Sequence, residues 1–211
     1  MRLHDQLREK IMNITLLLPA GRLPLEIMAK ALEVAEKYHL GVYLSTTQNL
    51  RLLNVPEEAV DAVKAELAPL GVQFKGPGKF PLPRVCVGAP HCNLGVIDTE
   101  RLSAAITARF KDKAMTKPKF KIAVSGCPLA CSGVLTTDIG VMATRAGFEM
   151  YAGGKGGPYP KVGRRILRKA TEEEVLEVIE KLVNFHDAHT VKKQRLYKLL
   201  DHPDFPFPEA V

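Results

Sequence analysis

The first third of the chain has apolar runs and helical spacings that alternate in a regular order. Apolar runs at residues 11–18, 42–46, 50–55 and 72–74 predict four strands, because Pro or Gly residues bound them. Apolar positions three and four residues apart predict two helices, one beginning at Pro24 and one at Pro56. The resulting order β-α-β-β-α-β is that of a ferredoxin-like split βαβ fold.

The Pro- and Gly-rich segment 76–83 separates this half from a second one, and we expect a domain boundary after residue 78. Beyond it, the pattern predicts strands at about 121–125, 139–143 and 148–152 and helices at about 98–110, from 171 and at about 192–200. Thr171 and Glu174 have the spacing of a capping box. We therefore expect an α+β protein, with a ferredoxin-like half-domain over residues 1–78 and an α/β domain over residues 79–211.

Composition narrows the class of protein. The 211 residues can bury a real core, and 46% hydrophobic with 25% charged residues excludes wholesale disorder. No run approaches the roughly eighteen apolar residues of a membrane span, and the first residues are polar, so we expect a cytoplasmic protein without a membrane segment. Four cysteines are too few for a disulfide scaffold, and they indicate metal ligands or reactive thiols.

The positive charge lies in the same part of the chain as the cysteines. The net charge is +7, and residues 81–170 alone hold fifteen basic and five acidic side chains. Basic excess often indicates nucleic acid, but 6% aromatic residues, no Trp and no RNA-binding signature argue against that partner. A polyanionic ligand explains the charge better, and a basic surface without a specific partner is the alternative.

The four cysteines are spaced C-x5-C and C-x3-C, at Cys86, Cys92, Cys127 and Cys131. Pro128 suits the first position of a helix, which would place Cys127 and Cys131 on one face and favour thiolates there. Zinc usually uses C-x2–4-C knuckles and bacterial ferredoxins use dense C-x2-C-x2-C runs. An isolated iron–sulfur cluster is favoured, and an all-cysteine zinc site and four unrelated buried cysteines remain as alternatives.

Several motifs together resemble one known family. Residues 86–92 (CVGAPHC) and 125–133 (SGCPLACSG) resemble the two halves of the sirohaem and 4Fe–4S motif of the assimilatory sulfite and nitrite reductase family. Residues 45–52 (STTQNLRL) are similar to the strand signature of its ferredoxin-like half, residues 117–121 (KPKFK) to its anion motif and residues 151–155 (YAGGK) to its Gly-Gly loop. The length matches the low-molecular-weight sulfite reductases, which have one copy of a unit that larger enzymes carry twice.

The resemblance implies a set of cofactor-binding residues. Cys86, Cys92, Cys127 and Cys131 would ligate a 4Fe–4S cluster, and Cys131 would also bridge to the iron of sirohaem. Residues 79–211 would thus form the domain that binds both cofactors. The partners expected for sirohaem carboxylates are Arg84, Lys155, Arg164 and Arg165, with the N–H groups of Gly153, Gly154 and Gly156. Hydrogen bonds to the macrocycle would come from Thr46, Gln48 and Asn49. An ordinary flexible turn and a solvated basic patch are the plainer interpretations of the glycines and arginines.

The resemblance also implies a reaction. It is the six-electron reduction of sulfite to sulfide, or of nitrite to ammonia, with electrons from a ferredoxin or a similar small protein. Lys119 and Lys121 would hold the oxyanion and deliver protons, unless they are a basic pair that protects an edge strand.

The chain departs from the family pattern in two places. Thr47 stands where the family has an arginine, and residues 14–17 lack a second expected one. Arg51 is the residue that could substitute. These departures leave a non-catalytic iron–sulfur electron-transfer or cofactor-holding subunit as the alternative function, and a zinc-stabilised nucleic-acid-binding module as a third.

Overall fold

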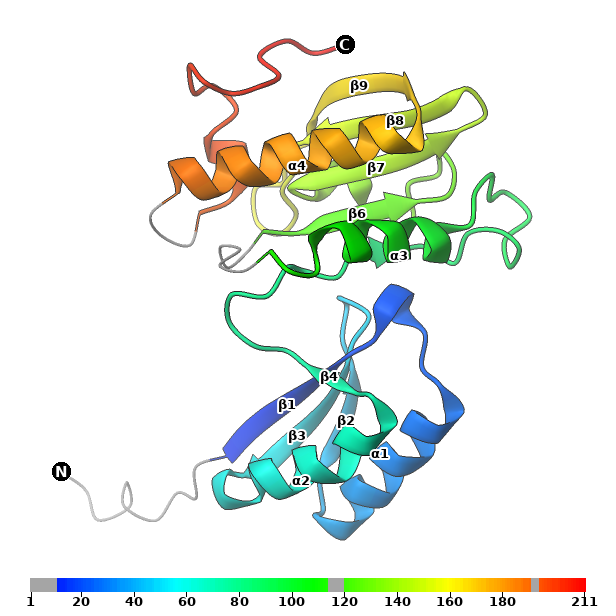
Figure 1. Ribbon diagram of the computed structural model, residues 1–211, viewed down its shortest axis with the longest axis vertical. Coiled ribbons are helices and arrows are strands. Elements are labelled where there is room, and N and C mark those ends of the chain that lie inside the picture. Colours follow the sequence, from blue (N-terminus) through cyan, green and yellow to red (C-terminus); the bar gives the residue numbers. More distant parts are fainter. Residues whose placement is uncertain (1–10, 114–119, 191–193) are drawn as a thin grey trace, which may run out of the picture. The chain divides into compact units, whose positions relative to one another are not determined.

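The structure is a computed structural model that describes residues 11–113, 120–190 and 194–211 (Figure 1). It divides into two compact units, residues 1–76 and 77–211, which are described separately. Within the described residues, we find no helix with the length and apolar character that a membrane crossing requires.

The first unit is a four-stranded antiparallel sheet with two helices. Its elements are β1 (Ile11–Leu17), α1 (Leu25–Lys37), β2 (Gly41–Leu44), β3 (Leu50–Pro56), α2 (Val60–Leu67) and β4 (Gln73–Phe74). The sheet order is β2-β3-β1-β4. The ferredoxin-like order predicted from the hydrophobic pattern is therefore confirmed.

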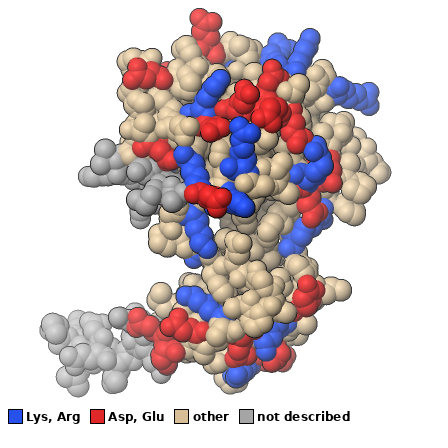
Figure 2. Space-filling model, viewed as in Figure 1, with Lys and Arg blue, Asp and Glu red and all other residues tan. Residues whose placement is uncertain are grey.

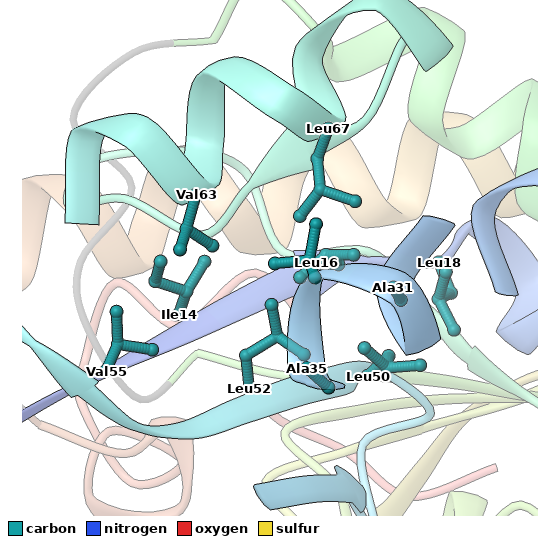
Figure 3. Close-up of a cluster of buried hydrophobic side chains, with 11 residues drawn as sticks. Ile14, Leu16, Leu18, Ala31, Ala35, Leu50, Leu52, Val55, Val63 and Leu67 are labelled. Atoms are coloured by element: carbon teal, nitrogen blue, oxygen red, sulfur yellow. The ribbon is translucent and has the colours of Figure 1, made fainter. Parts of the chain in front are cut away.

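The core of this unit follows from strand and helix periodicity. Alternate residues of a strand face the same side, and Ile14 and Leu16 of β1 are both buried. They pack with Leu52 of β3 and with Val63 and Leu67 of α2 (Figure 3). Burial of each such side chain contributes about 1.5–3 kcal/mol, which holds the helices on the sheet.

The second unit has a mixed five-stranded sheet. Its elements are β5 (Arg84–Val85), α3 (Thr99–Phe110), β6 (Ile122–Ser125), β7 (Ile139–Thr144), β8 (Gly147–Ala152), β9 (Arg164–Ala170) and α4 (Glu172–His189). The order is β5-β6-β7-β8-β9, with β5, β6 and β7 parallel and the last pairs antiparallel. The predicted α+β class is confirmed, but the sequence pattern gave no sign of β5 or β9.

Helices α3 and α4 lie side by side and are joined by ion pairs (Figure 1). Arg109 pairs with Glu173 at 3.0 Å and with Glu180 at 3.2 Å, and Lys113 lies 3.6 Å from Asp187. Lys and Arg side chains accordingly alternate with Asp and Glu on this face (Figure 2). Part of the positive charge of residues 81–170 is thus neutralised by acidic residues of α4.

In the C-terminal region, the sequence pattern predicted the start of α4 correctly but not the segment that follows this helix. The capping box at the start of α4 is confirmed, since the Thr171 hydroxyl accepts the Glu174 N–H and the Glu174 carboxylate accepts the Thr171 N–H. The helix predicted at about 192–200 is wrong within the described residues, which form a single 3-10 turn at Leu196–Lys198. The Leu196 N–H donates to the Asp138 carboxylate at 3.0 Å, which bends the chain toward β7.

Candidate metal-cluster centre

The two cysteine segments leave the sheet at the same edge. Cys86 directly follows β5, and Cys127 follows β6 after one glycine. Strands β5 and β6 are parallel neighbours, with Val85 opposite Val124. Because the carboxyl ends of parallel strands share one edge, where α/β sheets place their ligands, this topology brings the two segments together.

Main-chain contacts hold the two segments against each other. The Gly126 N–H donates to Cys86 Sγ at 3.1 Å, and the Val96 N–H donates to the Gly126 carbonyl at 2.8 Å. The Thr99 hydroxyl donates to the Cys86 carbonyl at 2.6 Å. A Cβ at position 126 would lie 3.1 Å from Thr99 Cγ2 and 3.2 Å from Gly88 Cα. The approach therefore depends on glycine at position 126.

The helix predicted to begin at Pro128 is wrong. Residues 127–131 form turns, in which the Ala130 N–H donates to the Cys127 carbonyl at 3.3 Å and the Gly133 N–H donates to the Ala130 carbonyl at 2.8 Å. Ala130 has a φ of 55°, in the left-handed region, where a helix stops. No helix dipole acts on Cys127, and the one main-chain N–H that we find on a cysteine sulfur in the described residues is that of Gly126 on Cys86 Sγ.

The four cysteines are free thiols and differ in exposure. Cys127 is buried, Cys86 and Cys92 are half-buried, and Cys131 is exposed. In the described part of the chain, the one place where three metal-binding atoms lie within 4.8 Å of one another is elsewhere and contains no cysteine. Sulfurs around a single zinc ion would lie about 3.8 Å apart, given Zn–S bonds of about 2.3 Å. Within the described residues, no three cysteine sulfurs lie as close together as a single zinc ion requires.

Arg84 is a half-buried cation beside the second cysteine segment. It lies on β5, and one Nη donates to the Thr137 hydroxyl at 3.2 Å. A Cβ on Gly133 would lie 2.7 Å from that nitrogen, so the guanidinium packs under the turn that follows Cys131. Its Nε is buried with no hydrogen-bond partner among the described residues, and burial lowers the pKa of the guanidinium. An unfilled buried donor of this kind fits an anionic group such as a tetrapyrrole carboxylate.

The other cations that we expected at the cofactor have partners within the protein. Arg164 donates to main-chain carbonyls in the segment 200–211 at 2.9 and 3.0 Å, and Arg165 donates to another at 2.6 Å. Lys155 donates to the carbonyl of Pro158 at 2.8 Å. These three side chains fasten the C-terminal segment and their own loop, and we leave them out of the proposed site.

The glycine N–H groups that we expected at the cofactor are also partly engaged within the protein. The Gly153 N–H donates to the Asp138 carbonyl at 2.8 Å. A Cβ on Gly154 would lie 2.6 Å from the main-chain nitrogen of Thr137. Both glycines are therefore required by close packing, and of the three only Gly156 is exposed.

In the first unit, the expected macrocycle contacts lie in the turn between β2 and β3. Thr46 is exposed and Gln48 is half-buried with a φ of 61°. Asn49 is buried, and its Oδ1 accepts the Leu18 N–H at 3.1 Å while its amide donates to the Thr47 carbonyl at 3.2 Å. Asn49 therefore joins two segments of its own unit.

The three cations that we expected to act in catalysis lie in different environments. Lys119 lies outside the described residues. Lys121 is exposed immediately before β6, and β6 is an inner strand, so protection of an edge strand does not explain it. Arg51 lies on β3, and its Nε is buried without a hydrogen-bond partner among the described residues.

Sequence reasoning missed Asp138, a fully buried carboxylate. It accepts from Arg195 Nε at 2.7 Å and from the Leu196 and Lys121 N–H groups at 3.0 and 3.1 Å. Burial raises its pKa even though the hydrogen bond and charge of Arg195 lower it. In the sequence, Asp138 stands out only as a single acidic residue directly before an apolar strand. Asp138 fixes the main chain at Lys121.

Comparisons with known proteins place the chain among reductases. The family model described as "Nitrite and sulphite reductase 4Fe-4S domain" matches residues 82–204, and "Nitrite/Sulfite reductase ferredoxin-like half domain" matches residues 4–70. The assimilatory-type sulfite reductase of Nitratidesulfovibrio vulgaris is 26% identical over 184 residues, which are 87% of this chain and 84% of that protein. The nitrite reductase [NAD(P)H] of Bacillus subtilis is 33% identical over 71% of this chain.

The fraction of each relative's length that this chain spans differs widely. The chain spans 17% and 18% of the nitrite reductases [NAD(P)H] of Emericella nidulans and Bacillus subtilis. The solved structure of the Mycobacterium tuberculosis NirA protein shares the fold, with a TM-score of 0.76 and 20% identity over 96% of this chain and 40% of that one.

Proposed function

Because the chain belongs to the nitrite and sulfite reductase family, with one ferredoxin-like half-domain and one 4Fe–4S domain, we propose that it reduces sulfite to sulfide. The assimilatory-type sulfite reductase, which the chain covers almost end to end, supports sulfite as the substrate. The nitrite reductases among the relatives support nitrite as a second substrate, reduced to ammonia with the same number of electrons. A ferredoxin or a similar small protein is the proposed electron donor.

The observation that carries this proposal is the meeting of the two cysteine segments at one sheet edge, with the Gly126 N–H on Cys86 Sγ. In the proposal, all four cysteines would hold a 4Fe–4S cluster, and the exposed Cys131 would also be a ligand shared with sirohaem. These groups would supply the single-electron chemistry. N–H groups directed at cysteine sulfur stabilise its negative charge, which suits a thiolate ligand.

The chain's own cations have three tasks in this proposal. Arg84, with its unfilled buried Nε, holds a carboxylate of the tetrapyrrole. Arg51, on β3, binds the oxyanion and so substitutes for the arginine that Thr47 replaces. Lys121 delivers protons, and Asp138 positions its main chain. Lys119 has the same proposed task as Lys121.

Two observations favour a second function, that of a cofactor-holding electron-transfer subunit. The position at which the family has an arginine is Thr47, which lies in an exposed turn. The chain also corresponds to a small part of several much longer reductases. In this alternative the cofactors are the same, but substrate is reduced elsewhere in a larger complex.

The two functions separate in one experiment on protein purified without air. We expect an absorption spectrum with a Soret band and a red band, and oxidation of reduced methyl viologen that depends on added sulfite. Both bands without sulfite- or nitrite-dependent oxidation would support the subunit instead. A colourless protein that contains zinc would contradict both.

Cys131→Ser tests the bridging role. We expect the variant to lose sirohaem or to shift its Soret band, and to lose sulfite turnover by at least about 100-fold, because a direct ligand matters more than the outer partners whose loss costs 10–100-fold. Leu129→Ser is the matched control, since Leu129 is exposed in the same turn. A Cys131→Ser protein with unchanged spectrum and turnover would contradict the bridge.

A further inference from the structure

Three side chains near the end of α4 bring metal-binding atoms together, away from the cysteines. His189 is the last residue of α4, and His202 and Asp204 lie in the segment that follows the 3-10 turn. One nitrogen of each histidine and one carboxylate oxygen lie within 4.8 Å of one another. None of these residues takes part in the proposed reduction.

The distances are close to those that a single small cation imposes. His189 Nε2 lies 3.5 Å and His202 Nδ1 lies 3.9 Å from Asp204 Oδ2. A tetrahedral zinc ion with bonds of about 2.0–2.1 Å separates its ligand atoms by about 3.4 Å. These two distances exceed the zinc value by about 0.1 and 0.5 Å, and all three ligand atoms lie within 4.8 Å of one another.

Hydrogen bonding sets which ring nitrogen of each histidine is unprotonated and can serve as a ligand. His189 Nδ1 lies 2.9 Å from the Phe185 carbonyl oxygen, which can only accept, so Nδ1 carries the proton and Nε2 is free to ligate. Such a bond from the second ring nitrogen to a main-chain carbonyl is typical of metal-binding histidines. His202 Nδ1 accepts the Asp204 N–H at 3.2 Å, so Nδ1 is unprotonated, and a metal ion would take the place of this hydrogen bond at its one lone pair. Two imidazole nitrogens and one carboxylate oxygen thus lie close enough together to share a cation.

The rings are held in place by packing, and the group is open to solvent. Phe185 stacks on His189 with ring centroids 4.4 Å apart and meets His202 edge-on at 5.7 Å. The side chains of His189 and His202 are 27% and 34% exposed, and that of Asp204 is 72% exposed. The arrangement is therefore pre-organised, and an ion can enter from water.

We propose that His189, His202 and Asp204 bind one divalent metal ion of the borderline class, with Zn²⁺ the best fit, and that water fills the fourth position. Two imidazoles and a carboxylate are ligands that zinc accepts, whereas calcium and magnesium prefer oxygen alone. The ion would link the end of α4 to the segment around residues 202–204. This metal site is independent of the cluster cysteines and of the proposed reductase activity.

The test is a zinc titration of the full chain, purified without air with its iron–sulfur cluster loaded so that the cysteines are occupied. Wild-type protein should take up one Zn²⁺ per chain at this site, and its melting temperature should rise with added zinc. His202→Gln and Asp204→Asn should each weaken that uptake by roughly 100-fold or more and abolish the rise, since each removes a direct ligand.

Asp201→Asn and His39→Asn are the matched controls. Asp201 is an exposed carboxylate in the same segment, and His39 is an exposed histidine of the first unit. Both should behave like wild type. Equal zinc uptake by Asp204→Asn, His202→Gln and wild type would overturn the proposal. Absence of zinc uptake by wild type would also overturn it, because protons alone would then hold the three side chains together. Asp204 is exposed, so its replacement leaves the fold intact.

Discussion

At the scale of single residues, two glycines decide how close the cysteine segments come. A Cβ on Gly88 would lie 2.5 Å from Thr99 Oγ1, and Gly88 also has a φ of 61° that favours glycine. A Cβ on Gly126 would press on the Gly88 main chain at 3.2 Å. In the proposed function the cysteines supply the ligands, and these glycines allow the two cysteine segments to approach each other.

Gly126→Ala should therefore lower the iron and sulfide content per chain. The added methyl group has to push main chain, which typically costs about 1–3 kcal/mol in a packed interior. Gly156→Ala is the control, because the nearest atom to its Cβ would be 3.9 Å away. Iron and acid-labile sulfide measured per chain check the result, and equal contents in the two variants would contradict it.

The sequence allowed us to predict which residues matter, but not which residues they contact. The spacing of the cysteines and the basic segment directed attention to the part of the chain that the 4Fe-4S domain model matches. The partners of Arg164 and Arg165 lie more than thirty positions away along the chain, in the segment 200–211, and no local pattern reveals such contacts. Buried Asp138 was missed for the same reason, because its partner Arg195 is 57 positions away.

At the scale of elements, periodic segments could be predicted and irregular ones could not. Strand β1 and helices α1, α3 and α4 have clear apolar periods and start signals. Strand β9, with the sequence RRILRKA, is largely charged and hides its period. The turns at residues 127–131 were missed because Pro128 suits the start of a turn as well as of a helix.

The contact between α1 and α2 predicts a dependence of stability on acid. Glu66 of α2 lies 2.8 Å from Lys37 Nζ and 3.0 Å from the Tyr38 hydroxyl, and these partners lower its pKa from 4.5 to about 2. A lowered pKa means that the stabilisation is present above pH 4.5 and is lost as the pH falls toward 2.

Glu66→Gln should remove that acid-dependent part of the stability. Urea denaturation followed by far-UV circular dichroism, at several pH values below neutrality, should show a smaller loss toward acid pH in the variant than in wild type. Glu58→Gln serves as the control, since Glu58 is exposed before α2. An acid profile of Glu66→Gln identical to wild type would contradict the assigned role of Glu66.

At the scale of the whole molecule, the two units carry different parts of the proposed chemistry. All four cysteines and Arg84 belong to residues 77–211, whereas Arg51 and the turn around Thr46 belong to residues 1–76. Each unit has its own sheet and its own buried core. Possession of a cluster and turnover of substrate are therefore separable properties.

Residues 77–211 expressed alone should retain a 4Fe–4S cluster and fail to reduce sulfite. The isolated piece keeps the β5–β6 edge and every contact between the cysteine segments. Iron analysis and the reduced methyl viologen assay check both parts of the prediction, with residues 1–76 as the iron-free control. A piece without iron, or one with full sulfite turnover, would contradict this division.

The main-chain contacts between the segments after β5 and β6 also bear on maturation and repair. Main-chain atoms and the Thr99 hydroxyl make these contacts, so the fold itself sets how the two segments approach each other. If the proposed cluster were destroyed by air, the same contacts would still hold the two segments together, so we expect the folded polypeptide to accept a new cluster without unfolding.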